Sequence, residues 1–271
     1  MTALREKLRG KLTKKELSSL RASFDVVGDI ALIEIPFELK KKEKLVGNAL
    51  LSLLKNVKVV AVKSSPHRGI YRRQKLKVIA GEKRLITVHK ESGILLRLDV
   101  EKCYFSPRLV TERLRIARLV KNGERVLVAG SGVAPYPIVI AKHSPVREII
   151  GVELNPVAHK YACENVLLNK LSNKVKLVKG DIRKVRLGLF DRIIVAIPHN
   201  GIKLVPSILK FAKKGAFLHV YDFASEENLS DAGARLRSAC SLKKKSCKVL
   251  RIVRAGQHAV RKYRVCVDAR L

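Results

Sequence analysis

Two glycines and a carboxylate that follows them by about twenty residues form the pattern in this sequence best suited to binding a nucleoside. An apolar strand ends in a turn that contains Gly130 and Gly132, and a second apolar strand, Ile149–Val152, ends in Glu153. In open parallel sheets, small turn residues let the backbone approach the ligand, and the acid binds ribose hydroxyls. Because Ala134 stands where a third glycine could stand, an ordinary strand-to-helix turn also fits.

Two further carboxylates lie where they could do chemistry. Glu112 falls in the first turn of a predicted helix, and Asp181 follows a predicted strand. A carboxylate within reach of a base nitrogen can take its proton. An acid in the first turn of a helix more often only offsets the helix dipole, and Asp181 can merely cap a turn. The residue types alone leave these alternatives open.

The elements that must position these residues alternate from Glu124 onward. The apolar patterns predict strands at 126–129, 148–152, 175–178, 191–197, 216–221, 248–253 and 262–268, and helices at 135–143, 156–169, 202–213 and 226–242. This alternation indicates an α/β domain with a Rossmann-like, mostly parallel sheet covered on both faces. The last two strands have no helix between them, so we expect an antiparallel pair.

The residues before this sheet have a different pattern, typical of a small α+β unit. One strand, a helical pattern at Lys40–Lys55 and a second strand come first, and strands joined by short turns follow. The loop Ser64–Arg73 is rich in turn residues and cations. With Tyr104–Arg108 as a hinge, we predict a basic helix or linker at 1–22, a small α+β domain at 23–102 and a sheet domain at 103–271.

Two further predicted helices lie outside the alternating region. Residues 1–20 indicate one short helix, either a packing arm or a basic arm for RNA, with an apolar stripe of Leu4, Leu8, Leu12 and Leu17. Leu109–Val120 forms a second helix, whose shared apolar face is expected to contain Val110, Leu114, Ala117 and Val120.

Positive charge dominates the composition. The chain of 271 residues has 57 Lys and Arg against 23 Asp and Glu, a formal net charge of +34. Such an excess repels itself in a compact fold, so a polyanion, above all a nucleic acid, is the expected partner. A basic composition without any partner is the alternative. An anionic membrane fits less well, because the cations are spread through the chain and do not gather on one amphipathic helix.

The cysteines and the termini indicate a cytosolic protein. The five cysteines, scattered in sequence, form no C-x-x-C pair and no cluster with metal-ligand spacing, so we expect reduced thiols and no metal. No apolar run is long enough to span a membrane, and the basic N-terminus has no secretory signal pattern. The working expectation is a cytoplasmic monomer.

Several blocks carry a resemblance that covers nearly the whole chain. They are Ser23–Pro36, Gly69–Gln74, Ile79–Glu82, Thr87–Glu91, Val100–Arg115, Glu153–Pro156, Glu164–Lys170 and Gly180–Arg183. In these blocks the sequence resembles the archaeal and eukaryotic tRNA (guanine-N1) methyltransferases that modify guanosine 37, beside the anticodon. The resemblance implies a class I fold dependent on S-adenosylmethionine, with tRNA as the partner. The sheet with its ligand turn resembles that of every class I methyltransferase.

The resemblance also implies roles for single residues. Arg72 would contact the target guanine, Tyr104 would line the site, and Glu112 would take the guanine N1 proton. Pro198 matches the proline of a short Asn-Leu-Pro segment. The residues implied at the cofactor are Arg113, Gly130, Gly132, Glu153 at the ribose, Leu154, Asp181 near the adenine, and Ile182, and those implied at the RNA are Arg72, Arg73 and Arg108.

These residue types suit the implied reaction. Guanine N1 is a poor nucleophile until its proton leaves, and a carboxylate can accept that proton as the methyl group arrives. An arginine on O6 would stabilise the negative charge that develops there. Without the resemblance, Arg72 is one cation of a basic loop that more often contacts phosphate, and Tyr104 could be a core residue.

The sequence departs from the family pattern at two positions. Val128 stands where the family usually has an acid in the first strand, and Ala196 replaces the asparagine of Asn-Leu-Pro. The work of that asparagine would fall to a neighbour, and His199 and Asn200 are the candidates. Under this hypothesis, Asn200→Ala lowers methyl transfer or cofactor affinity, and unchanged values of both contradict it.

Longer members of the family carry an additional N-terminal domain that checks the tRNA elbow, and the sequence matches only the shorter form. We therefore expect weaker dependence on intact tRNA shape, and affinity that falls steeply with salt.

Two other functions stay open beside methyl transfer. A sister enzyme on a similar scaffold transfers the aminocarboxypropyl group of the same cofactor in wyosine synthesis. It typically has glycine at the position of Arg108 and lacks the proline kept here as Pro198, and both features favour methyl transfer. The second alternative is a basic RNA-binding protein that has lost the chemistry, which Val128 and Ala196 motivate.

Overall fold

The computed structural model describes residues 3–197 and 199–271. It divides into two compact units, Met1–Pro107 and Arg108–Leu271, and the division lies within the segment Tyr104–Arg108. Each unit has its own sheet and its own hydrophobic core. Among the described residues, no helix is both long and apolar enough to cross a membrane.

The first unit contains a four-stranded sheet and a separate two-stranded hairpin. The sheet has the order β1-β2-β3-β4, in which only the central pair β2–β3 is parallel, and β5 and β6 form the hairpin. The bounds are β1 Phe24–Val27, β2 Ile30–Ile33, β3 Val59–Lys63, β4 Leu76–Gly81, β5 Ile86–Glu91, β6 Ile94–Asp99 and α3 Glu43–Leu53, which follows a 3-10 turn at Phe37–Lys42. The predicted helix and the strands after it are confirmed, but the residues before the helix form two strands, β1 and β2, where one strand was predicted.

The N-terminal segment forms two short helices, so the prediction of one helix over residues 1–20 is wrong. They are α1 (Ala3–Lys7) and α2 (Lys14–Ser19). Gly10 has a left-handed backbone (φ +79°) that ends the first, and a capping box between Thr13 and Glu16 begins the second. The predicted apolar stripe is confirmed for Leu4, Leu8 and Leu12, which are buried in the core of the first unit.

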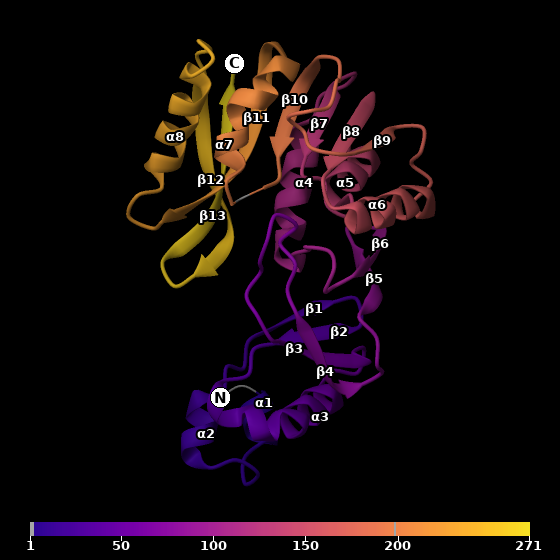
Figure 1. Ribbon diagram of the computed structural model, residues 1–271, viewed down its shortest axis with the longest axis vertical. Helices are drawn as coiled ribbons and strands as arrows, with labels where there is room; N and C mark the ends of the chain where they lie inside the picture. Colours follow the sequence, from indigo (N-terminus) through magenta and orange to yellow (C-terminus); the bar gives the residue numbers. More distant parts are fainter. Residues whose placement is uncertain (1–2, 198) are drawn as a thin grey trace. The chain divides into compact units, whose positions relative to one another are not determined.

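The second unit is built on a seven-stranded sheet with the order β12-β13-β11-β10-β7-β8-β9 (Figure 1). All neighbours are parallel except β13, which is antiparallel to both β11 and β12, as predicted for the last two strands. The bounds are α4 Val110–Leu119, β7 Arg125–Ala129, α5 Pro135–His143, β8 Glu148–Glu153, α6 Pro156–Leu168, β9 Val175–Lys179, β10 Phe190–Val195, α7 Gly201–Ile208, β11 Ala212–Ser225, α8 Ser230–Ser241, β12 Lys248–Ala259 and β13 Lys262–Arg270. A 3-10 turn, Pro107–Leu109, precedes α4, and another, Leu209–Phe211, follows α7.

Alternation along the strands separates two faces of this sheet. Leu218 and Val220 of β11 belong to the apolar core under α7 and α8. Between and after them, His219 and Tyr221 point to the opposite face, because successive side chains of a strand alternate. There they bond to side chains that connect to α4, so α4 lies on the face opposite α7 and α8.

The apolar face predicted for α4 is confirmed only in part, because Ala117 and Val120 are buried but charged residues share the buried face. The residues buried on this helix are Glu112, Arg113, Ile116 and Ala117, whereas Val110 and Leu114 of the predicted face are only partly buried. The pattern misled because the buried acid and its helix neighbour Arg115 compensate each other through hydrogen bonds.

Candidate active site

The glycine turn after β7 is bonded directly to the acid at the end of β8. Gly130 and Gly132 have left-handed backbones (φ +73° and +58°) that glycine adopts at no steric cost. The amide of Gly132 donates to Glu153 Oε2 at 2.7 Å, and the amide of Asn155 donates to Glu153 Oε1 at 2.7 Å. The predicted pairing of turn and acid is thus present as one hydrogen-bonded unit.

Helix α6 supports this turn from behind. The buried amide of Asn165 donates to the carbonyl oxygen of Val133 at 3.0 Å. Ala134 has φ +68°, so the position of the missing third glycine keeps a backbone that favours glycine. Asn155 caps α6 by accepting a bond from the amide of Val157. The loop is therefore fixed at both ends.

The side chains at this turn fit an adenosine-type group. Burial raises the pKa of Glu153, and backbone amides bonded to it oppose that effect. Its oxygens accept bonds from the backbone amides of Gly132, Asn155 and Leu154, and a carboxylate has about four acceptor positions, which leaves capacity for a ribose hydroxyl. The buried hydroxyl of Ser131 has no hydrogen-bond partner among the described residues. A Cβ on Gly130 would come within 2.3 Å of the Ile197 side chain, so a larger residue would force that side chain to shift.

The other residues expected at the cofactor follow two neighbouring strands. Asp181 comes shortly after β9, and the side chain of Arg183 pairs with it at 2.5 Å. This bond lowers the pKa of Asp181 to about 2. Ile182 is buried and Leu154 is partly exposed. Their contacts with a cofactor stay predictions, as does that of buried Arg113.

Glu112 lies at the same edge of the sheet as the glycine turn. Tyr221, whose hydroxyl donates to Glu112 Oε1 at 2.6 Å, follows the residue of β11 that pairs with the last residue of β10. The ring of Tyr221 is 5.7 Å from that of Tyr136, in the first turn of the helix that follows the glycine turn. The sequence-predicted carboxylate therefore lies near the nucleoside turn, with an exposed fraction of 4%.

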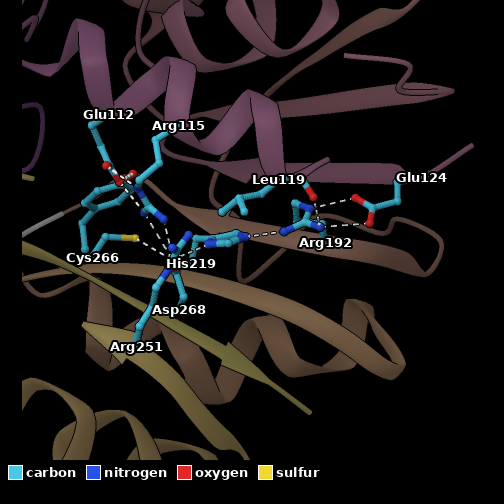
Figure 2. A network of polar contacts seen from close by, with 10 residues as sticks. Glu112, Arg115, Leu119, Glu124, Arg192, His219, Arg251, Cys266 and Asp268 are labelled. Carbon is cyan, nitrogen blue, oxygen red and sulfur yellow. Dashed lines mark hydrogen bonds and ion pairs between the residues drawn. The ribbon is translucent and has the colours of Figure 1, made fainter. Parts of the chain in front are cut away.

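A buried polar network extends from Glu112 across the sheet (Figure 2). Arg115 bonds Glu112 with two nitrogens, at 2.6 and 2.7 Å, and Asp268 at 2.6 Å. His219 Nδ1 is 2.6 Å from Asp268, and His219 Nε2 is 2.6 Å from Arg192. At the far end of the network, Arg192 donates to Glu124 at 2.7 Å and to the carbonyl oxygen of Leu119 at 2.6 Å.

Protonation states within the network follow from burial and bonding. Burial lowers the pKa of His219, so its ring is neutral, donates from Nδ1 to Asp268 and accepts at Nε2 from Arg192. Burial opposes ionisation of Asp268, but bonds from His219 and Arg115 hold its pKa well below its usual range. Burial raises the pKa of Tyr221 well above its ordinary value, so it remains a donor.

Sequence reasoning missed the network, although one signal points to it. Arg192, His219 and Asp268 are polar residues in the middle of the otherwise apolar strands β10, β11 and β13. A polar residue at such a place must find a buried partner, because an unsatisfied group there is costly.

The candidate RNA residues of the first unit lie on and beside one loop. Between β3 and β4 the chain forms a tight turn in which Arg68 and Arg73 exchange backbone bonds of 2.8 and 3.1 Å. Arg72 is at its tip with φ +52°, and the guanidinium of Arg73 lies over the ring of Tyr71 at 5.4 Å. The ring of Tyr104 is 5.0 Å from that of His67, so the loop and Tyr104 are brought together.

The remaining predicted residues lie after β10 or at the start of the second unit. Pro198 lies outside the described residues. Asn200 caps α7 with φ +64°, and the ring of His199 is 4.5 Å from that of Phe223. Arg108 is exposed in the turn before α4. The replacement of the family asparagine by His199 or Asn200 stays a hypothesis.

Comparisons with known proteins give relatives for both units. The family model for the TRM5/TYW2 methyltransferase domain matches residues 87–250, and the family model for the TYW2 N-terminal domain matches residues 4–84. The tRNA (guanine(37)-N(1))-methyltransferase Trm5b of Pyrococcus abyssi is 38% identical, over 93% of this chain and 76% of the relative. Its crystal structure has a TM-score of 0.87 at 37% identity and covers 96% of this chain and 78% of its own.

Two further relatives differ in the activity or partner that they name. The tRNA 4-demethylwyosine(37)-methyltransferase Taw21 of Saccharolobus solfataricus is 37% identical over 73% of this chain and 76% of the relative. The structure of aTrm5 in complex with tRNALeu has a TM-score of 0.88 at 30% identity, and the match covers all of this chain and 78% of that one. The sequence identity, the coverage and the shared sheet place the chain in the TRM5/TYW2 methyltransferase family.

Proposed function

We propose that the protein transfers a methyl group from S-adenosylmethionine to N1 of guanosine 37 of tRNA. One observation carries this proposal. In a chain of this family, the glycine turn bonded to Glu153 and the buried carboxylate of Glu112 lie at the same edge of one sheet. The first feature suits a nucleoside cofactor, and the second suits removal of a proton beside it.

The cofactor would be held by the turn and by the acids beyond the next two strands. Glu153 would accept bonds from the ribose hydroxyls, while Gly130 and Gly132 let the backbone approach. Asp181, with Leu154 and Ile182 beside the two acids, would border the adenine. When bound, S-adenosylmethionine supplies an electrophilic methyl group from its sulfonium.

Glu112 would accept the proton of guanine N1 as the methyl group arrives. Its carboxylate is buried and is held by bonds from Arg115 and Tyr221, so its orientation is set before the base arrives. Arg72 is proposed, from the family resemblance, to contact guanine O6 and to stabilise the negative charge that develops there. Tyr104, Arg113 and Pro198 are proposed to complete the binding of base and cofactor.

Binding of the RNA itself would depend on the basic surface. Arg73 and Arg108 are exposed, and the guanidinium of Arg73 lies beside an aromatic ring, which suits contact with phosphates and stacked bases. The net charge of +34 adds affinity that depends on salt rather than on sequence. We further propose that the enzyme acts as a monomer in the cytoplasm. The five cysteines, which form no disulfide, support the proposed compartment.

Aminocarboxypropyl transfer is the second candidate, because residues 4–84 match the N-terminal domain of TYW2. Both reactions use the same cofactor and differ in the group that leaves its sulfonium. Methylation of 4-demethylwyosine is a further outcome to be distinguished, since Taw21 is among the relatives.

The test is incubation of the purified protein with S-adenosylmethionine and either unmodified tRNA or tRNA that carries 4-demethylwyosine. Nucleoside mass analysis, with nuclease fragments to locate the product, gives the transferred group and its position. We expect N1-methylguanosine at position 37. A product heavier by the aminocarboxypropyl group, modification only of 4-demethylwyosine, or no product would refute the proposal.

A further inference from the structure

The proposed reaction assigns no chemical step to the buried residues that hold the Glu112 carboxylate. We propose that Arg115, itself held by Asp268, is a positioning residue that fixes the orientation and the charge of the Glu112 carboxylate for proton transfer. This inference rests on the proposed function, because it concerns the proton acceptor of that reaction.

The geometry around Arg115 leaves little freedom. Nε and Nη2 bond the two oxygens of Glu112, and Nη1 bonds Asp268 at 2.6 Å, so one planar guanidinium joins two carboxylates. Asp268 belongs to β13, which lies between β11 and β12 and is paired along both edges. The position of the Glu112 carboxylate is therefore fixed by the sheet, through Arg115 and Asp268, as well as by the first turn of its own helix.

The bonds also assign the oxygen that would receive the proton. Oε1 of Glu112 accepts from Arg115 Nη2 at 2.7 Å and from the hydroxyl of Tyr221 at 2.6 Å. Oε2 accepts only from Arg115 Nε, at 2.6 Å, among the bonds of the described residues. A carboxylate oxygen has two acceptor positions, so Oε2 keeps one for guanine N1–H.

Few of the groups around Glu112 are charged, so few of them can change the protonation of its carboxylate. Tyr221 of β11, Tyr136 of α5 and Cys266 of β13 all have a pKa raised by burial, so they are neutral. On its own helix, Arg113 and Arg115 are cations. Neutral His219 and ionised Asp268 lie behind Arg115.

These charges predict opposite effects from two substitutions. Without Arg115, the anionic Glu112 and Asp268 face each other with less compensation, so Glu112 takes up a proton at a higher pH. Without the charge of Asp268, Arg115 acts on Glu112 unopposed, so Glu112 loses its proton at a lower pH and becomes a weaker base.

Two other roles for the cluster fit less well. Donor atoms of His219, Cys266 and Asp268 lie within 4.8 Å of one another, which is a metal-like grouping. However, Asp268 already bonds Arg115 and Arg251, and guanidinium groups repel a metal ion. The second alternative is that the cluster only anchors α4 to the sheet. Arg192 already anchors the other end of this helix by bonding Leu119 and Glu124. Neither role requires the two-nitrogen contact with Glu112.

The experiment is the pH dependence of single-turnover methyl transfer. The midpoint of the acidic limb should rise by about one pH unit or more in Arg115→Gln and fall by a similar amount in Asp268→Asn. The matched control is Arg251→Gln, which removes a half-exposed arginine that bonds Asp268 at 2.7 Å and does not bond Glu112. Its midpoint should be unchanged.

Arg115→Lys separates charge from geometry. The ammonium keeps the positive charge but not the planar fork, so the midpoint should return towards the wild-type value while the rate stays about tenfold lower. If Arg115 were only structural, thermal stability would fall in these variants while the acidic limb stayed in place, and that result overturns the inference.

A second readout works without RNA. The carboxylate infrared band of Glu112, assigned by subtraction of the Glu112→Gln spectrum, is followed against pH in the free protein and in Arg115→Gln. An unmoved midpoint overturns the inference, whereas an upward shift supports it. Failure of the proposed function is seen separately, as a wild-type protein that transfers no methyl group to tRNA.

Discussion

At the scale of single residues, Glu153 shows a conflict between binding and stability. Its pKa is raised by burial, so its ionised form costs folding free energy. A raised folded-state pKa contributes stability below the ordinary glutamate pKa, and that stability is lost as pH rises through the folded value. At neutral pH the fold therefore carries an unfavourable charge, which suits a residue kept for its ligand.

We predict that Glu153→Gln weakens S-adenosylmethionine binding while it raises the free energy of unfolding at neutral pH. The loss of charged bonds to two ribose hydroxyls should increase Kd by about 10- to 100-fold in calorimetry. The gain in stability should shrink as pH falls below the ordinary glutamate pKa, because the wild-type carboxyl group is then neutral as well.

Glu148 at the start of the same strand is the matched control. Bonds from Lys176 and Arg125 lower its pKa, so it contributes stability above the ordinary glutamate pKa that is lost as pH falls. Glu148→Gln should therefore lower the free energy of unfolding at neutral pH and leave cofactor affinity unchanged. Equal effects of the two substitutions would contradict the role given to Glu153.

At the scale of elements, the glycine turn after β7 gives the sharpest prediction. Gly130→Ala should destabilise the protein by about 2–4 kcal/mol and weaken cofactor binding, because a left-handed alanine is strained and its Cβ would meet Ile197. Gly123→Ala has a similar backbone (φ +76°) but no atom within 4 Å of the new Cβ. It should cost about 1–2 kcal/mol.

Chemical denaturation and calorimetry on the two variants measure these effects. Gly123 precedes β7, at the edge opposite the cofactor turn, so its substitution should leave the Kd for S-adenosylmethionine unchanged. If Gly123→Ala weakened the cofactor as much as Gly130→Ala, a general loss of stability would explain both results.

The elements also show how far sequence alone can reach. The order of strands and helices in the second unit could be predicted, because buried parallel strands are continuous apolar runs between helical periods. The ends were less exact: β11 and β12 extend beyond their predicted ranges, and α7 and α8 are shorter than predicted. The break near Gly10 and the buried charged face of α4 could not be predicted. Apolar periodicity assumes that charged residues face water, and only the fold reveals that Arg115, which is held by Asp268, compensates the buried charge of Glu112.

The candidate site was predicted unevenly for the same reason. The turn with Gly130 and Gly132 and its bond to Glu153 follow from local spacing, since parallel strands end at one edge of a sheet. One partner of Glu112, Arg115, is its neighbour on the same helix. The other, Tyr221, comes from β11 at a separation of 109 residues, and Asp268 of β13, which holds Arg115, is 153 residues from that arginine. No local pattern encodes such contacts.

At the scale of the whole molecule, the net charge of +34 predicts how RNA binding responds to salt. Each phosphate neutralised releases counterions, so log K should fall with log salt with a slope of about −4 or steeper. Arg73→Gln should weaken binding and make that slope shallower by about one, because it removes one phosphate contact. Filter binding across a series of salt concentrations measures both.

Arg72→Gln provides the comparison for that series. If Arg72 contacts the base, its loss should lower the single-turnover rate at saturating RNA while the salt slope stays near the wild-type value. A slope shallower than about −2 for the wild-type protein would contradict the electrostatic account of binding.

The central claim is that Glu112 is the proton acceptor and not merely a first-turn acid. Its most direct test compares single-turnover methyl transfer in Glu112→Gln with that in Asp231→Asn, which removes an exposed acid from the first turn of α8. We predict a loss of about 100-fold or more for Glu112→Gln, with unchanged cofactor affinity, and no loss for Asp231→Asn. A Glu112→Gln enzyme that transfers the methyl group at the wild-type rate would contradict the account.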